Sequence, residues 1–283
     1  MTIDSGHLGQ WVGRSETMVE RISPFPAQTL AVTLDRNDPP YVDGSALPPL
    51  WHWLHFLTVS PMAEIGADGH PKRGGFLPPV PLPRRMWAGS RFRFLQPLRI
   101  GDTVSKVSTI ARVEHKSGRT GELVFVTVRH VYSGTSGPGI EEEHDIVYRE
   151  AATPGAPLPQ PPSAPADSQW SRVIHPDPVL LFRYSALTFN SHRIHYDQPY
   201  VTGTEGYPGL IVHGPLIATL LLDGLRRHRP EANITAFSFR AVSPLFDVAD
   251  FTVNGRLDGH KASLWASNAG GGLAMEATAE MAA

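Results

Sequence analysis

Polar and titratable side chains crowd one stretch of this 283-residue sequence, between Asn190 and Asp197. The amide of Asn190 lies five residues before the imidazole of His195, whose ordinary pKa near neutrality suits acid–base work. A short distance further on, His213-Gly214-Pro215 opens a long apolar run. A titratable side chain that lies next to the start of a helix favours chemistry at a carbonyl or a thioester.

The apolar run Leu216–Leu225 predicts a helix that is buried on most sides. Pro215 suits its first position, and Pro230 stops it after a basic last turn. If the helix begins at Gly214, unpaired amide N–H groups lie at its N-terminus, where they can stabilise an anion or a developing oxyanion. Asp223 interrupts the run, which is too short to span a bilayer.

Composition excludes several classes of function. With 25 basic and 27 acidic residues, the chain has no general attraction to nucleic acid or to an anionic membrane. The absence of cysteine excludes disulfides, thiolate metal sites and a cysteine nucleophile. No Gly-x-Ser-x-Gly or Walker sequence is present, so serine and nucleotide hydrolases lose support. The first residues lack a signal-peptide pattern, and we expect a cytoplasmic protein.

A Pro/Ala-rich stretch, residues 151–167, predicts an extended linker between halves of similar size, 1–150 and 168–283. One repeat supports a duplication, because Phe92–Leu98 matches Phe239–Leu245. Each copy follows a helix and a loop and precedes an aspartate and a strand. We therefore expect an α+β protein of two halves, each a curved antiparallel sheet around one apolar helix.

In the first half we expect an amphipathic helix over Trp11–Ile22, a strand over Gln28–Leu34, and an aromatic helix over Leu47–Leu57 as its central helix. Other strands are predicted from β-branched and aromatic content. They cover Phe92–Phe94, Thr103–Glu114, Leu123–Tyr132, Glu141–Arg149, Phe237–Val242, Asp247–Leu257, Lys261–Asn268 and Leu273–Ala279.

The motif residues resemble those of the MaoC-like, R-specific enoyl-CoA hydratases, which have a hot-dog fold. In that motif an aromatic residue precedes Ser/Thr, Gly, Asp, any residue, Asn, Pro, an aliphatic residue and His. The catalytic His of the motif aligns with His195, its Asp with Asn190, its Asn with His192 and its Pro with Arg193. The step His213-Gly214 resembles the helix start at which a Gly N–H of the family binds the thioester carbonyl.

The sequence Thr188-Phe189-Asn190, followed by His192–Asp197, resembles a narrower branch that contains mesaconyl-C4-CoA (3-methylfumaryl-CoA) and itaconyl-CoA hydratases. Leu47–Phe56 and Gly74–Phe94 resemble the FAS1-like dehydratase N-terminal half of that branch. The resemblance implies a double hot dog, with a degenerate half (1–150) and a catalytic half (168–283). It also implies an acyl-CoA thioester substrate, no cofactor and, as one possible state, a homo-oligomer.

The departure at Asn190 shapes the expected chemistry, because Asn can orient a water but cannot take its proton. We expect His195 to be the general base, Asn190 to hold the water and Gly214 to donate to the oxyanion. Asp197 is a competing base, although it could simply pair with Arg193. His192, His195 and Asp197 could also bind a metal, but a fourth ligand is not evident and we expect none.

Basic and aromatic residues supply candidates for binding. Each basic residue alone is typical of a solvated surface charge, while the cluster of Lys72, Arg73, Arg84 and Arg85 fits CoA phosphates best. Candidates for contact with CoA phosphates, a substrate carboxylate or the acyl chain are Arg193, Arg183, Arg84, Arg85, Lys72, Arg73, His192, Tyr184 and His213.

Four functions remain open at this point. The first is a hydro-lyase that adds water to mesaconyl-C4-CoA or itaconyl-CoA to give citramalyl-CoA. The second is a dehydratase of unbranched 3-hydroxyacyl thioesters, and the third is a hot-dog thioesterase. The fourth is a non-catalytic acyl-CoA-binding protein, because Asn190 stands where the motif has Asp.

Overall fold

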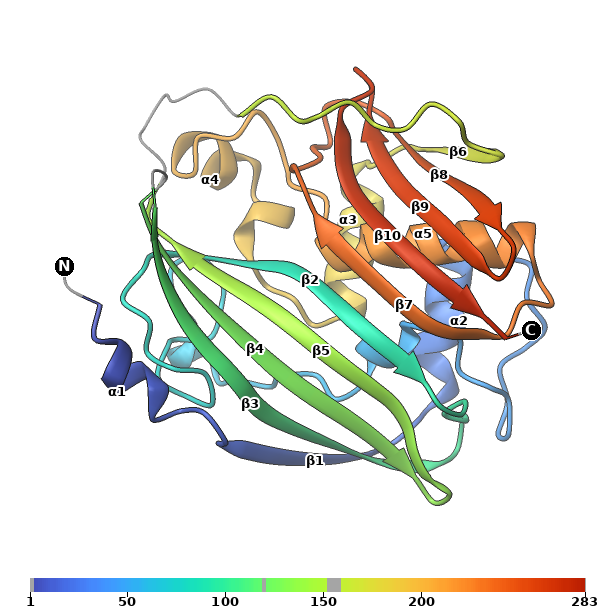
Figure 1. Ribbon diagram of the computed structural model, residues 1–283, viewed down its shortest axis with the longest axis horizontal. Coiled ribbons are helices and arrows are strands. Elements are labelled where there is room, and N and C mark those ends of the chain that lie inside the picture. Colours follow the sequence, from blue (N-terminus) through green and yellow to red (C-terminus); the bar gives the residue numbers. More distant parts are fainter. Residues whose placement is uncertain (1–2, 119–120, 152–158, 283) are drawn as a thin grey trace.

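The computed structural model describes residues 3–118, 121–151 and 159–282. In these residues one antiparallel sheet of ten strands curves around the helices (Figure 1). The strands are β1 (Ser15–Arg21), β2 (Arg84–Phe94), β3 (Thr103–Gly118), β4 (Gly121–Gly134), β5 (Gly137–Arg149), β6 (Trp170–Ile174), β7 (Ile234–Ala241), β8 (Phe251–Asp258), β9 (Lys261–Asn268) and β10 (Leu273–Met281).

The sheet order is symmetric about its middle. It runs β1-β3-β4-β5-β2 in the first half and continues as β7-β10-β9-β8-β6, which is the same arrangement in reverse. Where β2 meets β7, Ser90 pairs with Phe239 and Phe92 with Phe237. The sequence repeat aligns Phe92 with Phe239, and therefore Ser90 with Phe237. If the two halves are exchanged, the pair Ser90–Phe239 becomes the pair Phe237–Phe92, which is the other observed pair. The register therefore agrees with a duplicated chain.

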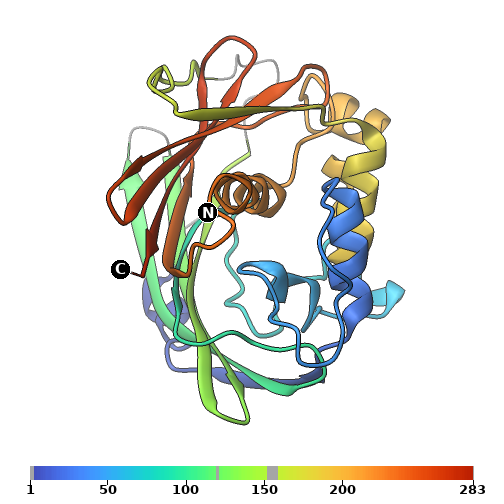
Figure 2. The same ribbon diagram turned by 90° about the vertical axis from the view of Figure 1, so that its right-hand side faces the viewer.

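Helices fill and close the concave side of the sheet (Figure 2). The α-helices are α1 (Ser5–Gly9), α2 (Pro24–Thr33), α3 (Pro178–Leu187), α4 (Gln198–Gly203) and α5 (Gly214–His228), and the 3-10 turns are η1 (Trp51–Leu54), η2 (Met62–Glu64) and η3 (Arg193–His195). α2 and α3 pack side by side, and α5 lies between them and the strands of the second half.

The prediction of a buried helix from Gly214 is confirmed. Ten consecutive residues of α5, Leu216–Leu225, are buried, and each fully buried leucine contributes about 1.5–3 kcal/mol. Asp223 lies in this run with 1% exposure and is paired with Arg36, Arg172 and Arg227. These ion pairs supply the compensation that a buried carboxylate requires.

Two predictions near the N-terminus are wrong. Residues 15–21 of the expected helix form the edge strand β1, whose side chains alternate in exposure where it pairs with β3. The strand expected over Gln28–Leu34 is part of helix α2. Proline in its first turn and buried Ala27, Leu30 and Ala31 at helical spacing decide for a helix, despite the β-branched residues between them.

The central helix expected over Leu47–Leu57 is also wrong, because only the single 3-10 turn η1 forms there. Pro48 and Pro49 lack the amide hydrogens that a helix uses, and φ is +70° at Leu50 and +55° at Phe56. Left-handed residues at both ends stop the coil within one turn. The other predicted strands are confirmed, except that β8 begins at Phe251 and residues 247–250 form a loop.

Residues 152–158 of the expected linker lie outside the described residues. The following part, 159–167, packs on the second half, because Pro162 O accepts from Leu273 N and Ala164 N donates to Gly271 O. Among the described helices, none has the length and apolar character needed to cross a bilayer.

Candidate active site

The segment between α3 and α5 carries the motif residues and folds into short turns. Thr188 Oγ1 donates to the Tyr184 carbonyl at 2.7 Å as α3 ends. The side-chain oxygen of Asn190 accepts from the backbone N–H of His192 at 3.0 Å, which stabilises the turn leading into η3. These turns place His195, the last residue of η3, against His213 just before α5.

His195 is buried, with 7% of its surface exposed. Its Nδ1 lies 2.7 Å from the carbonyl oxygen of Ile211. Because a carbonyl oxygen only accepts, Nδ1 carries the proton and the neutral ring leaves Nε2 as a free acceptor. Burial lowers the pKa of His195 to about 4, although the hydrogen bond to Ile211 opposes that shift. At neutral pH this imidazole is an uncharged base that can take up a proton.

His213 forms one wall of the site. Its ring stacks on that of His195 with 3.7 Å between centroids, and Tyr184 meets it edge-on. The Nε2 of His213 lies 2.8 Å from Ser185 Oγ, while its Nδ1 is buried without a partner among the described residues. Burial holds the pKa of His213 well below its ordinary value. The buried Tyr184 and His213 therefore support the shape of the site rather than line an exposed surface.

The N-terminus of α5 opens toward free space. Its N-cap residue, His213, makes no side-chain cap, and Pro215 has no N–H to offer. A methyl group added at Gly214 would meet nothing within 4 Å. The Gly214 N–H is thus a backbone donor at the positive end of a fifteen-residue helix, next to the residue that stacks on His195.

Asp197 has other partners. Its Oδ1 accepts from the Tyr200 N–H at the start of α4, and its Oδ2 pairs with Arg193 at 2.8 Å. The hydrogen bonds from Tyr200 and Arg193 lower the pKa of Asp197. Arg193 also donates to Ala67 O and lies over the Tyr200 ring. Both residues hold the segment in place, so the geometry favours the structural role for this pair.

The first half contributes to the site through a loop that the sequence motifs did not predict. The loop around Gly69, between η2 and β2, docks on the motif segment, with Ser191 Oγ donating to Gly69 O and Arg193 N donating to Asp68 O. Gly69 has φ +88°, and a Cβ there would lie 1.8 Å from Ser191 O. The His70 ring then lies against that of His192, tilted by 40° with 3.9 Å between centroids. The sequence Asp68-Gly69-His70 is typical of a turn, which is the one local signal of this contact.

Asp68, His70 and His192 bring three donor atoms within 4.8 Å of one another, which is a set that could hold a metal ion. Burial lowers the pKa of His70 and lowers that of His192 to about 2, and the charge of Arg85 contributes to both shifts. A guanidinium this close also disfavours a divalent cation. Neutral imidazoles are the form that binds a metal, so it is the charge of Arg85 alone that opposes a cation at this trio.

The basic candidates differ in what they contact. Arg84 pairs with Glu205 at 3.2 Å and donates to Tyr207 OH, and Lys72 donates to Ala63 O. Arg73 donates to the carbonyls of residues 80, 82 and 83. Arg183 is exposed on α3, where it lines a pocket together with residues of α2 and β6.

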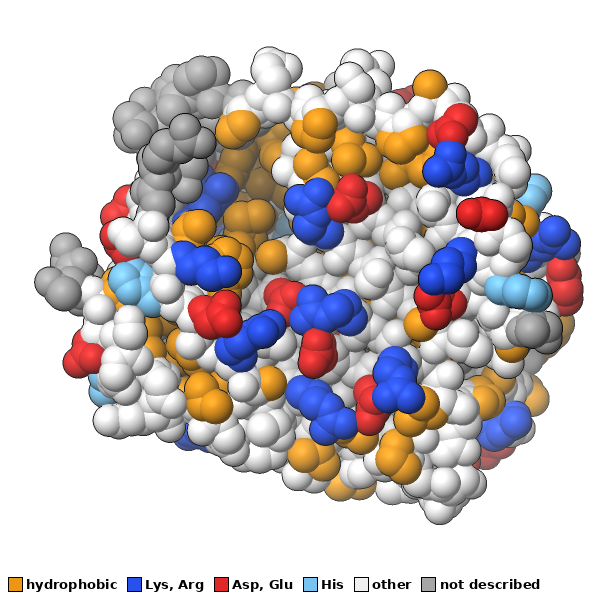
Figure 3. Space-filling view, viewed as in Figure 1, with side chains coloured by type: hydrophobic (Ala, Val, Ile, Leu, Met, Phe, Trp, Pro, Cys, Tyr) orange, Lys and Arg blue, Asp and Glu red, His pale blue; other side chains and the backbone are white. Residues whose placement is uncertain are grey.

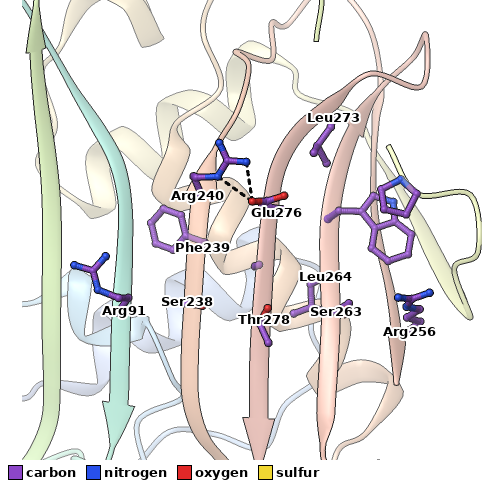
Figure 4. A pocket seen from close by; sticks show the side chains of 13 residues that line it. Arg91, Ser238, Phe239, Arg240, Arg256, Ser263, Leu264, Leu273, Glu276 and Thr278 are labelled. Carbon is purple, nitrogen blue, oxygen red and sulfur yellow. Dashed lines mark hydrogen bonds and ion pairs between the residues drawn. The ribbon is translucent and has the colours of Figure 1, made fainter. Parts of the chain in front are cut away.

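A hollow and two pockets mark the surface of the residues that the structure describes. Pairing between β2 and β7 ends at Gly89 opposite Arg240, and Figure 3 shows a hollow where these strands part, beside α4, with apolar walls and basic side chains in and around it. The first pocket, about 450 Å³, lies on the outer face of the sheet (Figure 4). Its arginines Arg91, Arg240 and Arg256 are all paired with acids. The second pocket, about 370 Å³, is lined by residues of α2, β6 and α3 and by Leu220 of α5, but by neither His195 nor Gly214. The hollow beside α4 is therefore the candidate entrance.

The comparisons with known proteins agree with this architecture. A family model described as hydroxyacyl-thioester dehydratase type 2 matches residues 50–247. The chain is 48% identical over 274 residues, 96% of each protein, to a mesaconyl-C(4)-CoA hydratase of Chloroflexus aurantiacus.

Solved structures show the same fold. A MaoC-like dehydratase of Phytophthora capsici aligns with a TM-score of 0.71 at 14% identity over 99% of both chains. A Mycobacterium tuberculosis protein described as a double hot dog aligns with a TM-score of 0.57 at 12% identity over 96% of both. The chain is thus a double hot dog, and it belongs to the hydroxyacyl-thioester dehydratase type 2 family of lyase-type enzymes.

Proposed function

We propose that this protein reversibly adds water to mesaconyl-C4-CoA, giving citramalyl-CoA. The observation that carries the chemistry is the state of His195, whose Nδ1 is held by Ile211 O so that Nε2 is left as a buried, neutral base. The similarity to a mesaconyl-C(4)-CoA hydratase over nearly the whole chain supports the choice of substrate. Itaconyl-CoA, a short dicarboxylic enoyl-CoA of the same class, is the second substrate to test.

In the first step, His195 acts as the base while the N-terminus of α5 binds the thioester oxygen. The thioester carbonyl accepts a hydrogen bond from Gly214 N–H, which withdraws electrons from the double bond. His195 Nε2 removes a proton from water, and the hydroxide oxygen bonds to the β-carbon, which carries the methyl group and the free carboxylate. The electron pair of the double bond moves onto the thioester oxygen as an enolate. The N-terminus of α5 stabilises that charge.

The second step restores the enzyme. The His195 imidazolium gives its proton to the α-carbon of the enolate, the thioester carbonyl re-forms and His195 is neutral again. One base thus serves both proton transfers, which is consistent with Asn190 in place of a second acid. The Asn190 oxygen is used by His192 N, so its amide N–H₂ remains to orient the water.

We further propose a division of labour in which 168–283 carries the catalytic groups and 1–150 is a degenerate half that covers the substrate. The contact of Asp68, Gly69 and His70 with the motif segment supports this cover. The single turn η1 supports the degenerate assignment, because no long helix starts there to present a backbone donor.

The test is turnover of mesaconyl-C4-CoA, itaconyl-CoA and crotonyl-CoA by purified protein, with water addition followed by mass spectrometry. His195→Gln should lower kcat about 100- to 10,000-fold, the range that general acid–base catalysis contributes. His175→Gln is the matched control, because His175 is an exposed histidine paired with Asp250. Full activity of His195→Gln would contradict the assigned base.

The family description also favours a second function, dehydration of unbranched 3-hydroxyacyl thioesters. A preference for crotonyl-CoA over both dicarboxylic substrates would select it. Release of free CoA, detected with a thiol reagent, would instead identify a thioesterase. Binding of acyl-CoA without any turnover would identify a non-catalytic binding protein.

A further inference from the structure

The positive charges around the candidate site are mostly neutralised. Arg193 is paired with Asp197 and Arg84 with Glu205. The guanidinium of Arg73 donates hydrogen bonds to three backbone carbonyls. A dicarboxylic acyl group brings a second negative charge into this region, and none of these three side chains is free to meet it.

Arg85 differs from them. Among the described residues, no Asp or Glu lies within ion-pair distance of its guanidinium. It is half-buried on β2 directly opposite Tyr148 of β5, and cross-strand partners point to the same face of a sheet. Tyr148 is 2% exposed within the core, so Arg85 points to the concave side, where the helices and the motif segment lie.

The Arg85 guanidinium also lies near the histidines of the site. Its charge contributes to the lowered pKa values of His70 and His192, whose rings lie against each other. His192 in turn meets His195 edge-on at 5.5 Å. Arg85 is thus a half-buried cation on the side of the sheet that faces the proposed base, and it lies in the strand where β2 parts from β7.

We propose that Arg85 binds the free carboxylate of the acyl group and so determines specificity for dicarboxylic enoyl-CoA substrates. This inference rests on the proposed function. In mesaconyl-C4-CoA that carboxylate is attached to the β-carbon that water attacks. A guanidinium can bind both carboxylate oxygens through two parallel N–H donors. It fixes the β-carbon relative to His195 and offsets the negative charge that would repel the incoming oxygen.

Kinetics with matched substrates test this role. Arg85→Gln should lower kcat/KM for mesaconyl-C4-CoA about 100-fold or more, as expected when one partner of a desolvated ion pair is removed. It should change kcat/KM for crotonyl-CoA, which has no carboxylate, less than about 3-fold. Arg85→Lys should restore part of the loss. The control is Arg93→Gln on the same strand, because Arg93 is exposed on the outer face and pairs with Glu141.

Binding separates this inference from the proposed function. Succinyl-CoA and butyryl-CoA, which cannot be hydrated, carry a carboxylate and a methyl group, respectively, on the β-carbon. We expect wild type to bind succinyl-CoA more tightly in calorimetry, and Arg85→Gln to abolish that preference. A preference that survives in Arg85→Gln, or an equal loss on both kinetic substrates, would overturn the role of Arg85. Wild type that shows the preference without hydrating mesaconyl-C4-CoA would overturn only the proposed reaction.

Discussion

The two halves follow the same path up to one step and then differ. In the first, Ala46 bridges Arg99 and Leu47 N donates to Leu98 O; in the second, Ile211 bridges Phe246 and Val212 N donates to Leu245 O. The next residues are Pro48-Pro49-Leu50 in one half and His213-Gly214-Pro215 in the other. The first yields a single 3-10 turn and the second a fifteen-residue helix. A proline at the position of Gly214 removes the one backbone donor that the proposed chemistry needs.

The length of the stretch before each bridge explains why the first half has no counterpart of His195. The stretch between α2 and the bridge at Ala46 is residues 34–45, whereas the stretch between α3 and the bridge at Ile211 is residues 188–210. Only the longer stretch has room for η3 and α4. Among the described residues, the first half therefore lacks both the helix start and the turn that carries the proposed base, which supports its proposed role as a cover.

The first half buries a polar network where the second has its long helix. Glu142, 2% exposed, contacts His52, Tyr132 OH and Trp53 Nε1. Burial would raise the pKa of Glu142, but the hydrogen bond to His52 and nearby imidazoles lower it to about 2. This acid is fully engaged inside the first half. It is a structural anchor for the single turn η1, whereas the titratable group of the second half keeps a free nitrogen.

The largest effect on stability is expected at Asp223 of α5, whose carboxylate joins the second half to Arg36 of the first. Asp223→Ala leaves Arg36 of the first half, Arg172 and Arg227 without their shared carboxylate. We expect a loss of about 3–5 kcal/mol in the free energy of unfolding, because one side of a buried ion-pair network is removed. Urea unfolding at neutral pH measures it. Asp250→Ala, which breaks an exposed pair with His175, should change stability by less than about 1 kcal/mol.

A proline at residue 214, as at Pro49 in the first half, tests whether the N–H at the start of α5 is needed. His213 has φ −58° and ψ 128°, a conformation that suits a residue before proline, and a side chain at Gly214 meets open space. Gly214→Pro should therefore fold, yet lower kcat about 100- to 1,000-fold by removing one oxyanion donor. Steady-state kinetics with mesaconyl-C4-CoA measure it.

Gly214→Ala is the matched control, because it adds a methyl group but keeps the N–H. We expect it to change kcat only a few-fold. Equal losses in the alanine and proline variants would mean that the space at residue 214 matters rather than the donor. Unchanged kcat in Gly214→Pro would show that the thioester oxygen binds elsewhere.

The cover of the site is tested at Gly69. Gly69→Ala places a Cβ against Ser191 O at a position with φ +88°, and we expect a loss of at least about 2 kcal/mol of stability, with a lower kcat/KM, as the loop shifts off His192. Gly74→Ala in the same loop has φ +100° but meets nothing within 4 Å. It should cost only about 1 kcal/mol, the conformational term alone. Similar kinetics in both variants would argue against a role for this contact.

Features that depend on local sequence could be predicted, whereas features that depend on contacts between distant residues could not. The density of apolar residues after Gly214 predicted α5, and the repeat at Phe92 and Phe239 predicted the symmetry of the sheet. The contact of Asp68 and His70 with the motif segment could not be predicted, because it joins residues more than a hundred positions apart. The sequence predicted a helix where β1 forms and a strand where α2 forms, because pairing with β3 and packing on α3 outweigh intrinsic propensity.

The smallest effect compares a buried neutral histidine from each half. Burial lowers the pKa of His195 to about 4 and that of His130 to about 3, both below the ordinary 6.5. As pH falls below 6.5 the unfolded chain binds protons that these folded-state rings refuse, so stability decreases until the folded pKa is reached. At pH 5 each ring accounts for a loss of about 2 kcal/mol relative to neutral pH. His195→Gln and His130→Gln should each reduce the decrease in urea-unfolding free energy between pH 7 and 5 by that amount. Only His195→Gln should also lower kcat, by about 100- to 10,000-fold. A pH dependence of stability unchanged in His195→Gln would mean that this ring is already protonated in the folded protein at pH 5, which would contradict its assignment as a neutral base with a strongly lowered pKa.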